Sequence, residues 1–289
     1  MPRDKLARFV ANIHPRARRM THDWDHNGKW HKDADRINSS QALCVSVFGS
    51  LARSRQRKGI MIEIMQRASL EMTPSGTPRI ECEYSDPDLL NEKGGISTPT
   101  SIDVLARWSD LILTIESKFT ESGFGACSQP KNGACNGSFA SGSDLRTRTS
   151  APCRLMVWEG RRTPRLYWDI GATLFRPEII TAPLRPCPFA SDHYQLMRNL
   201  ALACAAAQRS SHVRFAFIVA FVEGAPHARE LMTTVNHFRD ALRTEIRSVV
   251  GMVSYEAIAE ILRRWKERKL AEFLNRRLAS VHDSEVTLP

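Results

Sequence analysis

The sequence predicts an α/β fold in which a mixed central sheet is flanked by helices. A capped helix comes first, three strand-like segments follow it, and a second strong helix leads into an apolar strand. A two-residue apolar period is typical of strands, and a continuous apolar run is typical of a strand buried on both faces. With 289 residues, the chain is long enough for a core that needs no disulfides.

The N-terminal part combines a basic segment with a capped helix. Residues 1–37 are polar and basic with little periodicity, so we expect an irregular N-terminal arm. Residues 38–41 (Asn-Ser-Ser-Gln) can cap a helix and directly precede the apolar run at 42–48. They predict a helix that ends near residues 49–53. Residues 58–70 indicate a second helix or a mixture of helix and strand.

The next segments predict three strands. Residues 80–84 alternate with a period of two. Two further strand-like runs, 101–107 and 111–119, are separated by the short segment 108–110, and this spacing predicts a β-hairpin.

The second half of the chain begins with a long segment, 123–150, that is rich in Gly, Ser, Asn and Thr. A loop of this length inside a compact domain is usually functional or held by something else. The segment 194–208 is strongly helical, and 213–222 is the apolar strand. Two long helices are expected after it, at about 226–249 and 254–279, the second capped by Ser254.

The composition favours a polyanionic partner. The formal net charge is +10, and a positive field attracts nucleic acids, although a solubilising surface would give the same count. No apolar run reaches the roughly 18 residues of a membrane span, and no apolar signal segment follows the charged start. We therefore expect a cytoplasmic protein that does not enter membranes.

The strand at 111–119 carries an unusual pair of charges. Glu116 and Lys118 project from one face of a strand whose neighbours are apolar, and Asp103 lies across the hairpin, opposite the later part of this strand. Buried charges cost free energy unless they are paired or bind a metal. A salt-bridged pair on a half-exposed strand is the more frequent explanation of such a triplet taken alone. The position of Asp103 and the order of the elements weaken that explanation.

These three side chains suit phosphodiester hydrolysis. The reaction needs a divalent cation that polarises the phosphate and lowers the pKa of an attacking water. Mg²⁺ prefers a few hard oxygen ligands, which Asp103, Glu116 and the backbone carbonyl of Ser117 can supply, and Mn²⁺ can substitute for it. Lys118 can then orient or deprotonate the water and stabilise the developing negative charge.

Asp103 followed by Glu116-Ser117-Lys118 resembles the signature of the PD-(D/E)XK nucleases, with Ile102 in place of its proline. More narrowly, the chain resembles a group of bacterial restriction-endonuclease-like proteins. Four blocks carry this resemblance, at 38–41, 100–103, 115–121 and 194–199. The resemblance implies a restriction-endonuclease-like core, Mg²⁺ dependence and a DNA substrate.

Four further residues are secondary candidates. Glu83, on the strand before the hairpin, can add a carboxylate, although an exposed strand glutamate is the simpler explanation. The resemblance implies that Tyr194 and Gln195 touch the active site or the DNA backbone, although helix starts favour polar residues in any case. Gln41 on the first helix is a similar candidate. The histidines and aspartates of the arm, His31 among them, are interpreted as solvated side chains.

Four of the seven cysteines lie between the strand at 111–119 and the helix expected at 194–208: Cys127, Cys135, Cys153 and Cys187. Their spacing matches no compact zinc signature, and free cysteines are often small buried apolar residues. Cysteines in a glycine-rich loop have no obvious core to enter, so a bound Zn²⁺ ion or iron–sulfur cluster would explain how the loop is held.

Together these observations predict three parts of one domain and one activity. The parts are a basic N-terminal arm (1–37), a nuclease core (38–222) with an insertion at 123–190, and a C-terminal helical extension (223–289). The activity is that of a Mg²⁺-dependent deoxyribonuclease, for example a restriction or defence endonuclease. A repair or recombination nuclease and a non-catalytic nucleic-acid-binding protein on the same fold are the alternatives. DNA is the expected partner, and homodimerisation stays open.

Overall fold

The computed structural model describes residues 3–21, 24, 31, 33–93, 99–128, 138–139, 165–180, 185–187, 189–210 and 214–285. Its centre is a five-stranded mixed sheet with the strand order β1-β2-β3-β6-β7. The strands are β1 (Arg79–Ser85), β2 (Ser101–Arg107), β3 (Leu111–Ser117), β6 (Arg214–Phe221) and β7 (Val250–Ser254). The first three strands pair antiparallel, whereas β6 and β7 join the sheet in parallel. The predicted α/β class, with its mixed sheet flanked by helices, is confirmed.

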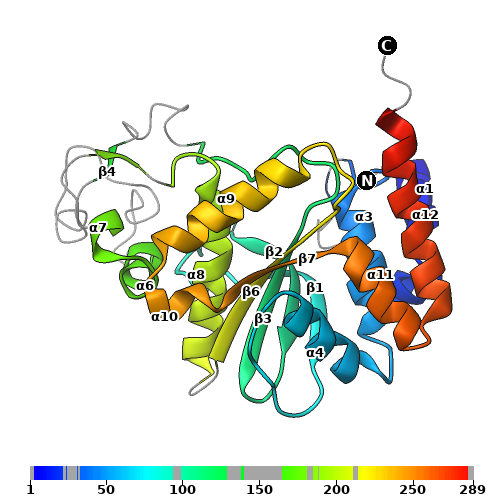
Figure 1. The fold of residues 1–289 in the computed structure, drawn as a ribbon, viewed down its shortest axis with the longest axis horizontal. Helices are drawn as coiled ribbons and strands as arrows, with labels where there is room; N and C mark the ends of the chain where they lie inside the picture. Colours follow the sequence, from blue (N-terminus) through cyan, green and yellow to red (C-terminus); the bar gives the residue numbers. More distant parts are fainter. Residues whose placement is uncertain are drawn as a thin grey trace.

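Helices cover both faces of this sheet (Figure 1). The helices that pack on one face are α1 (Arg3–Asn12), η1 (Pro15–Thr21), α3 (Ser40–Cys44), η2 (Val45–Gly49), α4 (Arg57–Arg67), α11 (Tyr255–Arg264) and α12 (Arg268–Glu285). The helices near the other face are α6 (Tyr167–Leu174), α7 (Pro177–Ile180), α8 (His193–Arg209), α9 (Ala228–Ala241) and α10 (Thr244–Arg247). A separate pair of short strands joins β4 (Ser138–Phe139) to β5 (Arg185–Pro186).

The hairpin divides its side chains between two apolar cores, as the alternation in the sequence predicts. Leu111, Leu113 and Ile115 of β3 lie in the core beside α3, α4 and α11. Ile112 lies in the core beside α8 and α9. β3 is buried along its whole length because β2 and β6 flank it and helices cover both of its faces. Any charged side chain on this strand is therefore held away from solvent.

The helix caps that the sequence predicts are present. The Ser39 hydroxyl accepts a hydrogen bond from the Ala42 N–H at 3.2 Å, and the Ser254 hydroxyl accepts one from the Ala257 N–H at 3.2 Å. The sequence left helix and a mixture of helix and strand open for residues 58–70. In the structure, residues 58–67 belong to the helix α4 (Arg57–Arg67), and no strand forms there.

The N-terminal arm is helical over much of its described part, and not irregular as expected. It forms α1 and the 3₁₀ helix η1, and its residues Phe9, Ile13 and Ala17 are buried in the core. These three residues recur every four positions, which is a helical period. The many arginines between them hide that period in the sequence.

The C-terminal segment 223–289 is not purely helical, because it contributes the strand β7 to the central sheet. Gly251 explains why this strand can lie so close to α4: a Cβ atom there would be in severe contact with the Ala68 carbonyl. The helix predicted at 254–279 is in fact two helices, α11 and α12. They are separated at Lys266, whose φ of 59° is incompatible with a continuous helix.

Within the described residues, no helix has the length and apolar character needed to cross a membrane. Much of the predicted insertion at 123–190, including Cys135 and Cys153, lies outside those residues.

Candidate active site

The three catalytic candidates meet at the centre of the sheet. Val104 of β2 pairs with Ile115 of β3, and since the two strands are antiparallel, Asp103 lies beside Glu116. Lys118 follows β3 directly, and its backbone N–H donates to the Ala220 carbonyl of β6 at 2.8 Å. The structure thus brings together the carboxylates and the lysine that the sequence selected.

Glu116 and Lys118 form a buried ion pair that α8 holds in place. Lys118 Nζ lies 3.0 Å from Glu116 Oε1, and the two side chains are 8% and 4% exposed. The Gln195 amide donates to Glu116 Oε1 at 2.6 Å, and the Asn199 amide donates to Glu116 Oε2 at 2.7 Å. Lys118 Nζ and the Gly125 N–H both donate to Gln195 Oε1, at 3.0 and 3.1 Å. The carboxylate of Glu116 is therefore fixed on both of its oxygens.

The surroundings of Lys118 keep it charged. Burial lowers the pKa of its ammonium, but the nearby carboxylates of Glu116, Glu121 and Asp103 raise it by more, so the net pKa is raised. The ammonium also lies 5.2 Å from the centre of the Phe124 ring, a cation–π contact. Lys118 is thus positioned as a permanent donor of hydrogen bonds and positive charge.

Asp103 is in a less favourable environment. The Ser117 backbone N–H donates to Asp103 Oδ2 at 2.7 Å. Burial, together with the negative charges of Glu116 and Glu83, holds the pKa of Asp103 well above its usual range, although the Ser117 N–H and Lys118 act in the opposite direction. Ionised Asp103 therefore costs free energy in the protein alone.

Glu83 continues this row of carboxylates onto β1. The pairs Cys82–Val104 and Tyr84–Ile102 place Glu83 opposite Asp103. Its φ of 51° lies in the left-handed region, which is rare for a residue with a side chain in a strand.

This backbone conformation has a visible consequence for the strand. Cys82 packs in the core beside α3 and α4, whereas Tyr84 packs against the other core, so the alternation of β1 inverts at Glu83. On β2, Val104 and Ile102 likewise pack in different cores, although they are two residues apart. Strained conformations of this kind are frequently found at functional sites.

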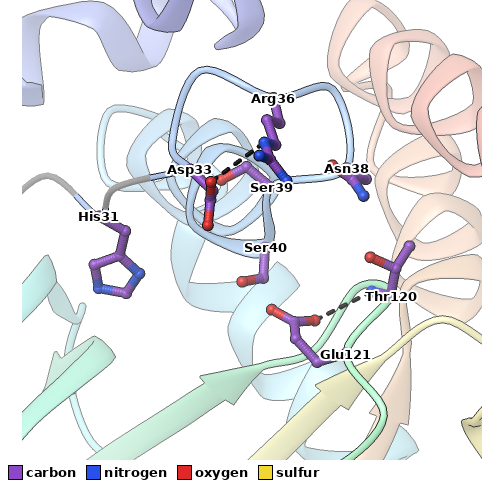
Figure 2. A pocket seen from close by; sticks show the side chains of 8 residues that line it. All are labelled: His31, Asp33, Arg36, Asn38, Ser39, Ser40, Thr120 and Glu121. Carbon is purple, nitrogen blue, oxygen red and sulfur yellow. Dashed lines mark hydrogen bonds and ion pairs between the residues drawn. The ribbon is translucent and has the colours of Figure 1, made fainter.

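A pocket of about 480 Å³ lies between the arm, the start of α3 and the segment after β3. It is lined by His31, Asp33, Arg36, Asn38, Ser39, Ser40, Thr120 and Glu121. Figure 2 shows Glu121 pointing into this pocket from the segment after β3, below Ser40 at the start of α3. The Glu121 carboxylate accepts the backbone N–H groups of Phe119 and Thr120 at 2.7 and 3.1 Å.

His31 lines the pocket and also lies near the carboxylate of Glu83. It was not predicted as a site residue from the sequence. Its Nε2 lies 3.8 Å from Glu83 Oε2, and its side chain is 60% exposed. Its backbone N–H donates to Gln41 Oε1 at 3.0 Å. The Gln41 side chain thus anchors the arm to α3. No local pattern in the sequence indicates that the arm returns to the active site.

Asn199 was also missed as a site residue. It lies four residues after Gln195, on the same face of α8, so both amides reach Glu116. This helical spacing is a signal that the sequence did contain.

The remaining secondary candidate, Tyr194, contacts a neighbouring arginine of α8. The Tyr194 ring stacks under the guanidinium of Arg198, with 5.3 Å between the guanidinium carbon and the ring centroid. The Ser117 hydroxyl is hydrogen-bonded to the Tyr255 hydroxyl at 2.7 Å, which ties β3 to α11.

Two of the four loop cysteines are described. The Cys127 N–H donates to the Ala190 carbonyl at 3.1 Å, and the Ala190 N–H donates to the Cys187 carbonyl at 3.1 Å. The backbones of Cys127 and Cys187 are therefore close to each other in the fold. Zinc or cluster binding by the four cysteines stays a prediction, because Cys135 and Cys153 lie outside the described residues.

The donor set at the hairpin suits a hard divalent cation. Asp103 and Glu116 present carboxylate oxygens, and the like charges that raise the pKa of Asp103 are those that a cation would neutralise. In the part of the chain that the structure describes, no three His, Cys, Asp or Glu side chains form a ready metal-binding group. This arrangement is compatible with Mg²⁺, which is usually bound through one or two carboxylates and keeps several waters.

The fold and the site define an α/β protein with a buried carboxylate–lysine cluster on the hairpin of its central sheet. A family described as Restriction Endonuclease associating with ARP matches residues 2–278. The chain belongs to this family, which confirms the predicted restriction-endonuclease-like relationship and indicates a nuclease. No curated protein and no solved structure matches the chain.

Proposed function

We propose that the protein is a Mg²⁺-dependent endodeoxyribonuclease of the PD-(D/E)XK type, with Asp103, Glu116 and Lys118 as its catalytic residues. The observation that carries this proposal is the buried Glu116–Lys118 pair beside Asp103, in a chain of a restriction endonuclease family. A structural ion pair would not need a second carboxylate whose charge is unfavourable in the protein alone.

The side chains have distinct roles in this proposal. Asp103, Glu116 and the Ser117 carbonyl hold the cation, which when bound polarises the scissile phosphate and lowers the pKa of the attacking water. Lys118 orients that water through its ammonium and stabilises the negative charge that develops on the phosphate. Its raised pKa favours this role over that of a general base, because a base would have to be deprotonated near neutral pH.

The amides of α8 position the carboxylate of Glu116. Gln195 and Asn199 fix both oxygens of Glu116, so the carboxylate keeps one orientation before and after the cation binds. Such supporting groups usually contribute about 10–100-fold in metal affinity or activity.

The substrate in this proposal is DNA, and the biological setting is restriction or another form of defence. The net charge of +10 supports capture of a polyanion. The family description names an association with ARP, and we include such a partner in the proposal.

Nicking of a supercoiled plasmid in the presence of Mg²⁺ or Mn²⁺ tests this function. The wild type is expected to nick the plasmid, and Asp103→Asn and Lys118→Met are expected to be slower by about 10²–10⁴-fold, since each removes a group that acts on the reacting atoms. Asp88→Asn and Lys93→Met are matched controls, because Asp88 and Lys93 form an ion pair with each other and both side chains are exposed. Equal nicking by the wild type and both site variants would contradict the assignment.

A further inference from the structure

A second pocket, of about 230 Å³, lies on the α8 side of the catalytic residues. Gln195 and Asn199, whose amides hold Glu116, also line this pocket. Thr100, Tyr194 and Arg198 form further parts of its wall. A group bound here would therefore lie one side chain away from the carboxylate that we place at the cation.

Arg198 is held in this wall by a network of fixed partners. Its Nε donates to the Thr100 hydroxyl at 3.0 Å and to the Tyr167 hydroxyl at 3.3 Å. Its Nη2 lies 3.5 Å from Glu92 Oε1, and its guanidinium stacks on the ring of Tyr194. The side chain is 21% exposed, so it is largely buried while it still forms part of the pocket wall.

Glu92 makes this network rigid. Its side chain is fully buried, at 0% exposure. It accepts hydrogen bonds from the Thr100 N–H at 2.8 Å, the Thr100 hydroxyl at 3.2 Å and the Tyr167 hydroxyl at 2.6 Å. The guanidinium of Arg198 is thus oriented before any ligand binds, which reduces the entropy cost of binding.

The chemistry of the pocket suits a phosphate group. A fixed guanidinium recognises phosphate oxygens through several N–H groups at once, whereas a lysine acts only as a point charge. The hydroxyl of Ser101, which also lines the pocket, can donate to a further oxygen. A purely structural role for Arg198 would require the ion pair with Glu92 but no cavity beside it.

We propose that this pocket binds a phosphate group of the DNA strand next to the scissile phosphate, and that Arg198 recognises it. This inference rests on the nuclease function proposed above. The phosphate can be an internal diester of the strand or a terminal phosphate near the cut, since both present anionic oxygens. Its capture would fix the register of the strand over Asp103 and Glu116, so Arg198 is a positioning residue.

A test combines substrate and protein changes. The substrates are duplexes in which one phosphate around the cut site is replaced by a neutral methylphosphonate, at a different position in each duplex. Cleavage of each duplex is measured with the wild type and with Arg198→Gln. In the wild type, neutralising one phosphate next to the cut is expected to lower cleavage by about 10–100-fold, the usual effect of losing a hydrogen bond to a charged group. In Arg198→Gln, the same neutral position is expected to cause no further loss. Parallel duplexes with 5′-phosphate or 5′-hydroxyl ends close to the cut show whether a terminal phosphate is the ligand.

Two variants control for folding and for nonspecific charge. Arg198→Lys keeps the positive charge beside Glu92, so it is the informative variant if Arg198→Gln does not fold. The methylphosphonate should slow cleavage by Arg198→Lys less than it slows cleavage by the wild type. Arg209→Gln removes an exposed arginine of the same helix that pairs with Asp86. The methylphosphonate should slow this variant as much as it slows the wild type. Thermal melting of each variant establishes that it is folded.

The outcomes separate this inference from the nuclease function. The wild type can cleave while every methylphosphonate slows Arg198→Gln and Arg198→Lys as much as it slows the wild type. In that case the phosphate pocket is wrong and the nuclease function stands. If no duplex is cleaved, the nuclease function fails. Binding of the same duplexes, measured by fluorescence anisotropy, then tests the pocket: equal binding with and without each methylphosphonate would refute it as well.

Discussion

Glu116 and Asp103 are neighbouring carboxylates in the same hairpin, but the protein treats their charges in opposite ways. Glu116 receives two amide N–H groups and the ammonium of Lys118. Asp103 receives the Ser117 N–H and faces the carboxylates of Glu116 and Glu83, which raise its pKa together with burial. The chain thus gives Glu116 three donors and leaves the charge of Asp103 unfavourable. In the function that we propose, a bound cation would neutralise this second charge.

The largest expected stability effect is at Glu116. Glu116→Gln leaves the buried ammonium of Lys118 without its ion-pair partner, so the free energy of unfolding should fall by about 3 kcal/mol. Urea denaturation followed by circular dichroism measures this change. In the exposed pair, Asp88→Asn should change stability by less than about 1 kcal/mol. A Glu116→Gln variant as stable as the wild type would remove the contrast between the two carboxylates.

Asp103→Asn should change stability in the opposite direction. The variant keeps an oxygen that can accept the Ser117 N–H but removes the unfavourable charge, so without metal at pH 8 it should be more stable than the wild type by on the order of 1 kcal/mol. The pKa of Asp103 in the fold is raised above its unfolded value. The folded wild type therefore holds its proton to higher pH and loses stability as the pH rises through the folded pKa.

The pH dependence of the stability difference between Asp103→Asn and the wild type is the control for this prediction. Below the ordinary pKa range of an aspartate, both folded and unfolded wild type are protonated, and the advantage of Asp103→Asn should be small. It should grow as the pH rises towards 8, in chemical denaturation at a series of pH values. An advantage that is constant with pH, or a variant that is less stable throughout, would show that Asp103 is not under electrostatic strain.

The smallest expected effect concerns the backbone of Glu83. At its φ of 51°, Glu83→Gly should be more stable than Glu83→Ala by about 0.5–1 kcal/mol, because glycine adopts this conformation without a steric cost. At Glu81, on the same strand, the order should be reversed, since glycine weakens ordinary strand positions. The same order at both positions, measured by thermal melting, would contradict the strain at Glu83.

Local patterns predicted most of the sheet and the centre of the site. The alternation of 111–119 is a property of consecutive residues, so it showed which side chains share a face and isolated Glu116 and Lys118. Asp103 followed from the hairpin, because a short connection sets the pairing of its two strands. The caps at Ser39 and Ser254 are likewise local hydrogen bonds.

Contacts between segments that are distant in the sequence could not be predicted from local patterns. The strand β7 has five residues, and its place in the sheet depends on the close approach of Gly251 to Ala68. His31 reaches Glu83 only because the arm folds back over the sheet. The inversion at Glu83 breaks the two-residue period on which strand prediction depends, so the sequence suggested an exposed glutamate where the structure has a buried one.

The central claim is that Asp103 and Glu116 together bind a divalent cation, and Mn²⁺ binding tests it most directly. Titration of the purified protein with Mn²⁺, followed by the electron paramagnetic resonance signal of the free ion, measures the affinity without any substrate. We predict that the wild type binds Mn²⁺, that Mg²⁺ competes with it, and that Asp103→Asn weakens binding by about 10-fold or more, whereas Asp88→Asn leaves it unchanged. Equal Mn²⁺ affinity in the wild type and Asp103→Asn would contradict the claim.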